Sequence, residues 1–294
     1  MKSHKKFILL NIFILLGSCF LSCDKIEGPF KETVVNDNAS CPSGIFASES
    51  VVKKVLLEEF TGHSCGNCPA SHEISTSLKQ LYGNRLIILS VHAGSFAMPK
   101  NYPDGSFSYD FRSSCGNDLD NTFGNDAAGL PNGLIDRKKA NGNAIIRPTA
   151  WATEVQKSLS NPAMAGLQIV TNYESSEGKL CTSIQTEFTN DIQGSYKLVV
   201  YLAEDSIVNW QKDYRKTPEN IPDYLHRHVL RSAINGSFGE NIARGSIQSG
   251  TKIIRNFKTN INPAYMAVHC SVVAFLVDSA NAEVMQAEEK GILQ

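Results

Sequence analysis

A pair of cysteines separated by two residues constrains this chain more than any other feature of its sequence. Residues 51–60 form an apolar run rich in β-branched residues, and Cys65-Gly66-Asn67-Cys68 follows it closely. Pro69 suits the first turn of a helix, apolar residues then recur at a spacing of three to four, and residues 86–91 are continuously apolar. We therefore predict two parallel strands joined by a helix, with the dithiol at the start of that helix.

This position gives the two sulfur atoms a defined chemistry. The free N–H groups and positive partial charge of a helix N-terminus stabilise a thiolate. Cys65 is predicted to be the attacking thiol, and Cys68, one turn further, to resolve the mixed disulfide. A purely structural disulfide is the alternative, because exposure and thiolate character decide reactivity. His63 and His72 could add metal ligands, but structural zinc usually takes ligand pairs from separate segments, so no metal is predicted.

Two further residues stand where such a site needs them. Glu59 lies six residues before Cys65, at the position of the buried acid that moves the proton of the second cysteine in thioredoxins. Pro131 precedes a hairpin signalled by Asn141-Gly142, at the position of the thioredoxin cis-proline. The order of these elements resembles the thioredoxin fold. The resemblance implies that Glu59 assists proton transfer, and that Leu130 and Pro131 position a substrate strand beside the sulfur atoms.

The rest of the chain divides into an insertion and a β-rich half. Residues 93–128, which contain Cys115, are predicted to be an insertion with some helix of its own, because structureless loops of that length are uncommon. A helix with Trp151, Val155 and Leu159 on one face then ends the first domain. Short strands with turn signals between them predict a β-sandwich after it. The expected strands are residues 166–173, 179–188, 196–202, 224–231, 251–259, 271–277 and 283–288.

The fold class predicted is thus an α/β thioredoxin-like domain followed by an all-β immunoglobulin-like sandwich. The first domain, residues 49–161, has a central mixed sheet with flanking helices, and the sandwich covers residues 162–294. The formal net charge of −1 and the lack of a basic stripe exclude nucleic acid as a partner.

The first residues predict export. Three lysines precede an apolar run, residues 7–16, that is too short to span a membrane, so residues 1–22 are predicted to be a signal peptide. Cys23 is the preferred lipid acceptor, because Ser22 precedes it and polar residues follow; Cys19 is a second choice, and an ordinary cleaved signal remains an alternative. Lipid on Cys23 would attach the chain to a membrane, with residues 23–48 as a tether.

Six cysteines remain after the signal segment, which allows 15 pairings. Besides Cys65–Cys68, we predict Cys181–Cys270, with two buried free thiols as the alternative, and Cys41–Cys115. His226 and His228 would share one face of a predicted strand, and packing or hydrogen bonding explains them better than a metal.

Four segments together resemble the Omp-28-related family of outer-membrane proteins. They are EEFTGHSCGNCPA at residues 58–70, VHAG at 91–94, GLP at 129–131 and YLHRHVLR at 224–231. The resemblance covers most of the mature chain. It implies an outer-membrane lipoprotein with a thioredoxin-like domain and a C-terminal sandwich, for which surface adhesin or receptor roles have been suggested.

Two functions follow. The first is thiol–disulfide exchange on the thiols or disulfides of exported proteins, which needs no cofactor because Cys65 and Cys68 carry the electrons. The second is a surface-exposed binding or adhesin-type lipoprotein that recognises an unknown ligand and uses the first domain as a scaffold. Whether the chain is an enzyme therefore stays open. Both functions place it in the cell envelope, at the outer membrane, facing the periplasm or the surface.

Overall fold

The computed structural model describes residues 41, 46, 50–140 and 142–293. The predicted signal peptide, the lipid acceptor Cys23 and most of the predicted tether lie outside these residues.

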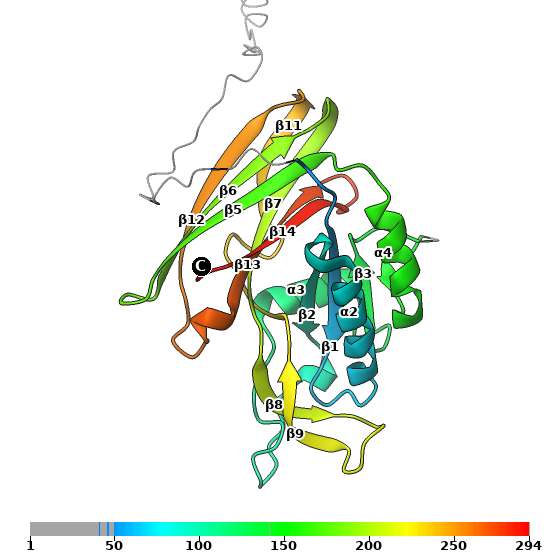
Figure 1. Ribbon diagram of the computed structural model, residues 1–294. Helices are drawn as coiled ribbons and strands as arrows, with labels where there is room; N and C mark the ends of the chain where they lie inside the picture. Colours follow the sequence, from blue (N-terminus) through cyan, green and yellow to red (C-terminus); the bar gives the residue numbers. More distant parts are fainter. Residues whose placement is uncertain (1–40, 42–45, 47–49, 141, 294) are drawn as a thin grey trace, which may run out of the picture. The chain divides into compact units, whose positions relative to one another are not determined.

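Fourteen strands and three longer helices make up the described part (Figure 1). The helices are α2 (Cys68–Tyr82), α3 (Ser114–Phe123) and α4 (Trp151–Leu159). The strands are β1 (Val55–Thr61), β2 (Leu86–His92), β3 (Asn132–Ile135), β4 (Ile145–Ile146), β5 (Ala165–Glu174), β6 (Lys179–Phe188), β7 (Ile192–Glu204), β8 (Ile207–Lys212), β9 (Asn220–His226), β10 (Val229–Ala233), β11 (Glu240–Ile247), β12 (Lys252–Asn260), β13 (Cys270–Asp278) and β14 (Val284–Gly291).

The predicted strand–helix–strand unit is confirmed. β1 and β2 are parallel over their whole length, and α2 connects them. β3 pairs antiparallel with β1, and the hairpin of β3 with β4 is also confirmed. Helices α2 and α4 cover one face of these strands through an apolar cluster that contains Leu78, Trp151 and Val155. The insertion contains α3, which packs on the opposite face through Cys115 and Leu119.

One nine-stranded sheet runs through both halves of the chain. Its order is β14-β13-β7-β10-β2-β1-β3-β4, with β11 paired to β7. Strands β7 and β13 are buried on both faces: Val199 and Tyr201 join the cluster around β1, whereas Leu198 and Val200 face a three-stranded sheet of order β12-β6-β5. The described residues are thus predominantly β. The division into domains at residue 161 stays a prediction, since this sheet includes strands from both sides of it.

The predicted strand over residues 224–231 is wrong. It is interrupted at His228, whose φ of 54° lies in the left-handed region, and its two halves, β9 and β10, belong to different sheets. His226 and His228 therefore do not share a strand face. Two strands, β8 and β11, were not expected from the sequence, because neither shows a clear alternation of apolar and polar residues.

Two of the three expected disulfides are also wrong. The structure pairs Cys41 with Cys181 and leaves Cys115 and Cys270 as buried free thiols. Alternation along β6 explains the difference, because Leu180 and Ile184 point into the core and Cys181 points to the other face. Cys270 packs inside that core, so it cannot reach Cys181.

The Cys41–Cys181 bond closes a loop of 140 residues, whereas Cys65–Cys68 closes only 3. Because a crosslink restricts the unfolded chain more when its loop is longer, we expect the C41A/C181A variant to lose about 2–5 kcal/mol of unfolding free energy. Denaturant titration measures this loss. The C65A/C68A variant is the matched control, and equal losses in the two variants would contradict the expectation.

Adjacent acids on β1 point to opposite faces of the sheet. Glu58 forms a two-bond ion pair with Arg137, at 2.8 and 2.6 Å, in the core that contains Phe275. Glu59 points to the α2 face instead.

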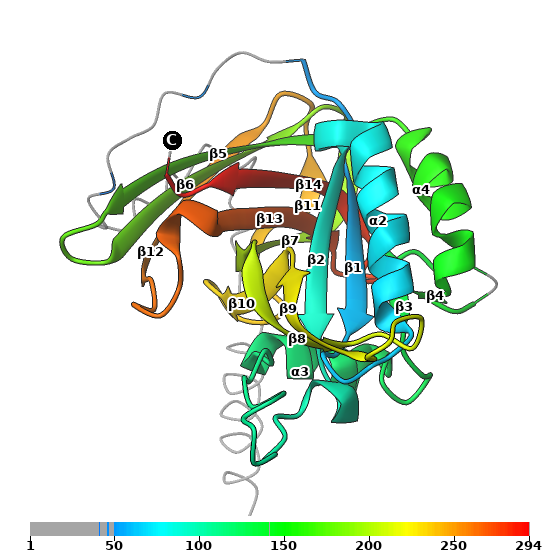
Figure 2. The ribbon, with the colours of Figure 1, turned by 60° about the horizontal axis from the view of Figure 1, so that its bottom comes forward.

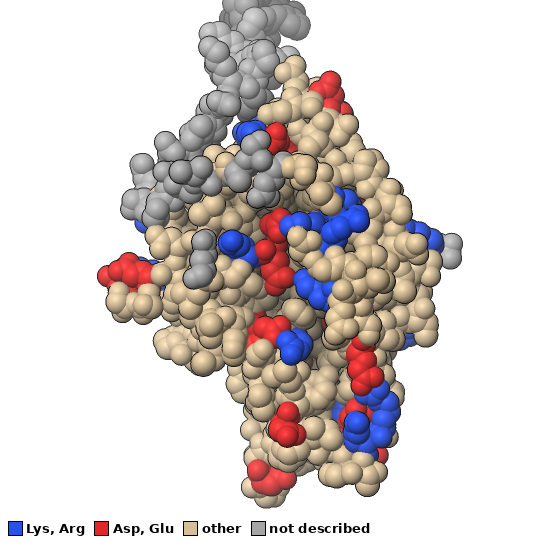
Figure 3. Space-filling model, viewed as in Figure 1, with Lys and Arg blue, Asp and Glu red and all other residues tan. Residues whose placement is uncertain are grey.

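On the surface, charged side chains of both signs are interspersed, and the face in Figure 3 carries no large patch of one sign.

Candidate functional site

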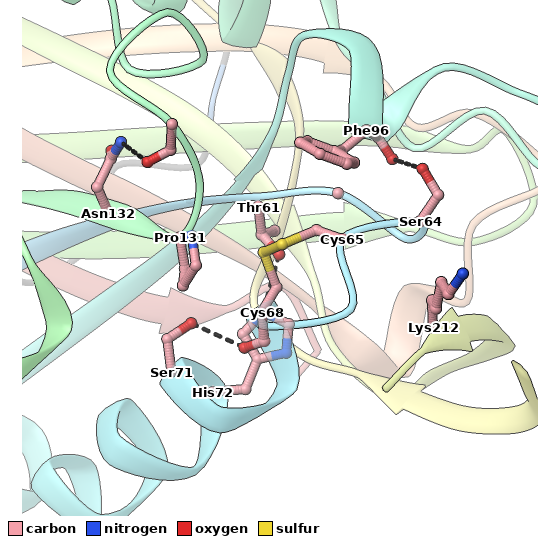
Figure 4. The surroundings of a disulfide bond; sticks show 12 residues. Thr61, Ser64, Cys65, Cys68, Ser71, His72, Phe96, Pro131, Asn132 and Lys212 are labelled. Carbon is pink, nitrogen blue, oxygen red and sulfur yellow. Dashed lines mark hydrogen bonds between the residues drawn. A yellow bond between two sulfur atoms is a disulfide. The ribbon is translucent and has the colours of Figure 1, made fainter. Parts of the chain in front are cut away.

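The end of β1 and the start of α2 position the Cys65–Cys68 disulfide (Figure 4). Between them the chain makes a tight turn, in which the Cys65 N–H donates to the Gly62 carbonyl at 3.0 Å. The helix begins at Cys68 with Pro69 in its first turn, as the sequence predicts. The disulfide thus lies at the N-terminal end of a helix of 15 residues, whose partial positive charge favours a thiolate there.

The loop before β3 brings a second predicted element to the disulfide. The Leu130–Pro131 peptide bond is cis, and Pro131 faces the two sulfur atoms from the side opposite Ser64 (Figure 4). The amide group of Asn132 fixes this loop by donating to the carbonyl oxygens of Asn125 and Gly129, at 2.8 and 3.0 Å.

Glu59 is buried beneath α2, and hydroxyl groups surround its carboxylate. Ser71 and Ser75 donate to its two oxygen atoms at 2.8 and 2.9 Å. The Ser71 hydroxyl also lies 2.8 Å from the carbonyl oxygen of Cys68. Both neighbours are acceptors that share the single proton of this hydroxyl, so Ser71 holds the predicted acid beside the backbone of the second cysteine.

His72 was not predicted to act with Glu59, yet it contacts that carboxylate. Its Nε2 atom lies 3.6 Å from Glu59 Oε1, and its Nδ1 atom lies 2.7 Å from the Tyr224 hydroxyl. Burial is the main cause of the raised pKa of Tyr224, so this phenol keeps its proton at neutral pH. Glu59, His72 and Tyr224 also line a pocket of about 390 Å³ beside α2. The acid therefore has a polar path toward solvent.

The disulfide itself is almost inaccessible. Cys65 is 3% exposed and Cys68 is 0% exposed. The insertion forms one wall: the Ser64 hydroxyl donates to the Phe96 carbonyl at 2.8 Å, and a Cβ atom at Gly62 would lie only 2.4 Å from the Phe96 backbone.

A second wall comes from β8, β9 and residues 213–219 between them, which we call the flap. In Figure 2 the flap crosses the ends of β1 and β2, near the start of α2. The Lys212 N–H donates to the His63 carbonyl at 2.8 Å, and the Tyr214 N–H donates to the Gly66 carbonyl at 2.9 Å. No pattern in the sequence indicates this cover, because about 145 residues separate it from the cysteines it covers.

The flap packs against a cluster of buried aromatic rings that includes three histidines, of which His226 is the last residue of β9 in the flap itself. The ring of Phe111 is 4.6 Å from that of His92 and 4.4 Å from that of His226, and the ring of His63 also contacts it. Burial lowers the pKa of all three histidines, that of His226 to about 3. These rings are therefore neutral at pH 7 and pack as part of the core. Among the described residues no group of three or more His, Cys, Asp or Glu could hold a metal ion.

The two free thiols are unsuited to exchange. Burial raises the pKa of Cys115, and it raises that of Cys270 to about 12. Both therefore remain protonated at neutral pH, and the thiolate is the reactive form. Among the described cysteines, Cys65 and Cys68 are therefore the candidates for exchange.

Fold and site define a predominantly β protein that carries a CxxC disulfide between a strand and a helix. Residues 117–293 match the family described as outer membrane protein Omp28, and the match covers more than half of the chain. The chain belongs to this Omp28 family. It is accordingly an outer-membrane protein of the cell envelope, as predicted. In the described part of the chain, no helix has the length and apolar character needed to cross a membrane.

A comparison with solved structures gives two further similarities. HBP35 of Porphyromonas gingivalis has a similar fold, with a TM-score of 0.63 and 19% identity, over 83% of this chain and 76% of that protein. A domain of the outer membrane lipoprotein Omp28 from Porphyromonas gingivalis aligns at 19% identity and a TM-score of 0.31, over 45% of this chain and 90% of that domain. A comparison with curated proteins finds no match.

Proposed function

We propose that this protein performs thiol–disulfide exchange on exported proteins, through a thioredoxin-like region over residues 49–161 that precedes an immunoglobulin-like sandwich. The observation that carries the proposal is the Cys65–Cys68 disulfide at the first turn of α2, linked through Ser71 to the buried carboxylate of Glu59. The parallel β1–β2 pair and the proline loop that faces the sulfur atoms support the same reading.

Starting from the disulfide form, a substrate thiolate attacks Cys65 Sγ and the Cys65–Cys68 bond breaks. Cys68 leaves as a thiolate, and Glu59 relays to it a proton that enters from solvent through the adjoining pocket, which Glu59 and His72 line. A second substrate thiolate then attacks the mixed disulfide and releases Cys65. The substrate has lost two electrons and gained a disulfide, and both cysteines are reduced. With a reduced pair, the same steps run in reverse and reduce a substrate disulfide.

We expect the full chain to accelerate reduction of insulin by dithiothreitol, and Cys65→Ser to abolish the acceleration because the attacking sulfur is lost. Cys68→Ser should instead trap a mixed disulfide on Cys65, which mass spectrometry detects. Cys270→Ala is the matched control, since this thiol lies in a separate core and should leave the rate unchanged. Equal rates for wild type and Cys65→Ser would refute the proposal.

A binding function is the second candidate, and the burial of both cysteines favours it. In that case the disulfide only stabilises the turn, and a ligand binds elsewhere on the surface. Exposed apolar side chains at Met98, Tyr102 and Tyr214 surround the covered site and would suit such a contact. Protease treatment of intact cells tests the surface exposure that an adhesin requires: cleavage places these residues outside the cell, and protection places them in the periplasm.

A further inference from the structure

The flap contacts the CxxC loop in the manner of a bound peptide. Two of its N–H groups, from Lys212 and Tyr214, donate to carbonyl oxygens of the loop. Donors two residues apart on one side are typical of an extended segment that adds to a backbone edge. The side-chain amide of Gln211 donates as well, to the Cys65 carbonyl at 3.1 Å.

The side chains of Tyr214 and Arg215 show which residue types fit against the CxxC loop and α2. Gly66 has no side chain, and the ring of Tyr214 occupies the space, so that a Cβ atom at Gly66 would lie 2.6 Å from the ring. One residue further, Arg215 forms two hydrogen bonds with Glu73 of α2, at 2.8 and 2.9 Å. The CxxC loop and α2 thus offer an aromatic site followed by a site for a basic side chain.

Some of the contacts that hold residues 211–215 are weak enough for another segment to replace them. Tyr214 is 53% exposed, and the Arg215–Glu73 pair is exposed, so solvent weakens both contacts. The Oε1 atom of Gln211 is buried and has no hydrogen-bond partner among the described residues, which disfavours its closed position. A competing segment therefore displaces the exposed contacts of Tyr214 and Arg215 first, whereas Gln211 and Asp213 are buried.

We propose that residues 211–215 occupy the binding place of the substrate, and that the substrate is an extended polypeptide segment with an aromatic residue followed by a basic one. This proposal rests on the function proposed above. Such a segment replaces residues 211–215 of the flap, pairs with the His63 and Gly66 carbonyls, and brings its own cysteine to Cys65. The flap then acts as a built-in competitor that keeps Cys65 covered until a polypeptide substrate arrives.

Tyr214→Ala tests the cover directly. We expect reduced Cys65 in this variant to react with iodoacetamide about tenfold faster than in the wild type, a change equivalent to the loss of one modest contact. Arg215→Gln should also make alkylation of Cys65 faster, because it removes the exposed ion pair with Glu73. Val208→Ala, which changes an exposed flap residue that does not hydrogen-bond to the loop through its side chain, is the matched control. Unchanged reactivity in both flap variants would overturn the proposal.

A synthetic peptide tests the substrate class. The peptide NWQKDYRKT, residues 209–217, should bind full-length Tyr214→Ala and slow alkylation of Cys65, and the same peptide with alanine for its tyrosine should not. Protection by both peptides, or by neither, would refute the aromatic site. In the wild type, amide hydrogen exchange at Tyr214 should be faster than at Ser90, whose N–H lies in β2. Equal protection at the two amides would contradict an exchangeable flap.

These results are distinguishable from failure of the proposed function. If Tyr214→Ala exposes Cys65, and the double variant with Cys65→Ser still accelerates insulin reduction to the same extent, the flap proposal stands and the exchange function fails. If Cys65→Ser abolishes the reaction but flap variants change nothing, the reverse holds.

Discussion

Replacing Glu59 with glutamine is expected to slow the second half of exchange by the reduced pair, the attack of Cys68 on the mixed disulfide, about 100-fold. The first half, the attack of Cys65 on the substrate disulfide, should be unchanged. The second half requires Cys68 to lose a proton before it attacks the sulfur of Cys65, and Glu59 is the buried carboxylate beneath the first turns of α2, held there by Ser71 and Ser75. Glutamine keeps the shape of the side chain, and the hydroxyls of Ser71 and Ser75 can turn to meet its amide. The fold should therefore survive the change.

Ellman's reagent resolves the two halves. Reduced Cys65 attacks the reagent and releases one coloured thiolate, and attack by Cys68 on the mixed disulfide releases a second. Only the second release should slow in Glu59→Gln. Glu154→Gln, which changes a carboxylate on α4, is the matched control. Equal slowing of both releases would indicate a general distortion of the site and would contradict a role for Glu59 in proton transfer.

The local part of this site was predictable from sequence because its causes are local. A strand that leads into Cys65, and Pro69 in the first turn, decide where α2 begins. The position of Glu59 on that strand then places its side chain against α2, since side chains alternate between the two faces. The same alternation turns Glu58 away, toward Arg137. Spacing along the chain was enough to choose between the two acids.

The remainder of the site depends on contacts between distant residues. His72 meets the Tyr224 hydroxyl across 152 residues, and Gln211 meets the Cys65 carbonyl across 146. No local periodicity encodes such contacts, so the cover and the polar path from Glu59 could not be foreseen. The disulfide predictions were wrong for a related reason. Residue spacing shows that Cys181 lies on a strand, but only the packing of that strand decides to which face its sulfur atom points.

Acid should destabilise the fold because it protonates the buried histidines of the aromatic cluster, His63, His92 and His226, when the chain unfolds. The folded state keeps His226 neutral down to a pKa of about 3, mainly because the ring is buried, whereas the unfolded chain protonates it below about pH 6.5. The unfolded state therefore binds more protons between these values, and stability that is fully present above pH 6.5 is lost as the pH falls. His226 alone should remove about 2 kcal/mol of unfolding free energy between pH 6.5 and 5.

His63 and His92 add to the same slope, since their pKa values are lowered too, and the nearby charges of His72 and Arg231 oppose protonation of His92. Denaturant titrations at pH 7 and pH 5 measure the loss. In His226→Gln the slope of stability with pH should decrease, by about 2 kcal/mol in total between pH 7 and pH 5, because one titrating ring is gone. Leu225→Gln, the matched control, perturbs the neighbouring position without a titrating group and should keep the wild-type slope. An unchanged slope in His226→Gln would show that the ring does not remain neutral in the folded state. It would contradict the packing of this ring in the buried aromatic cluster.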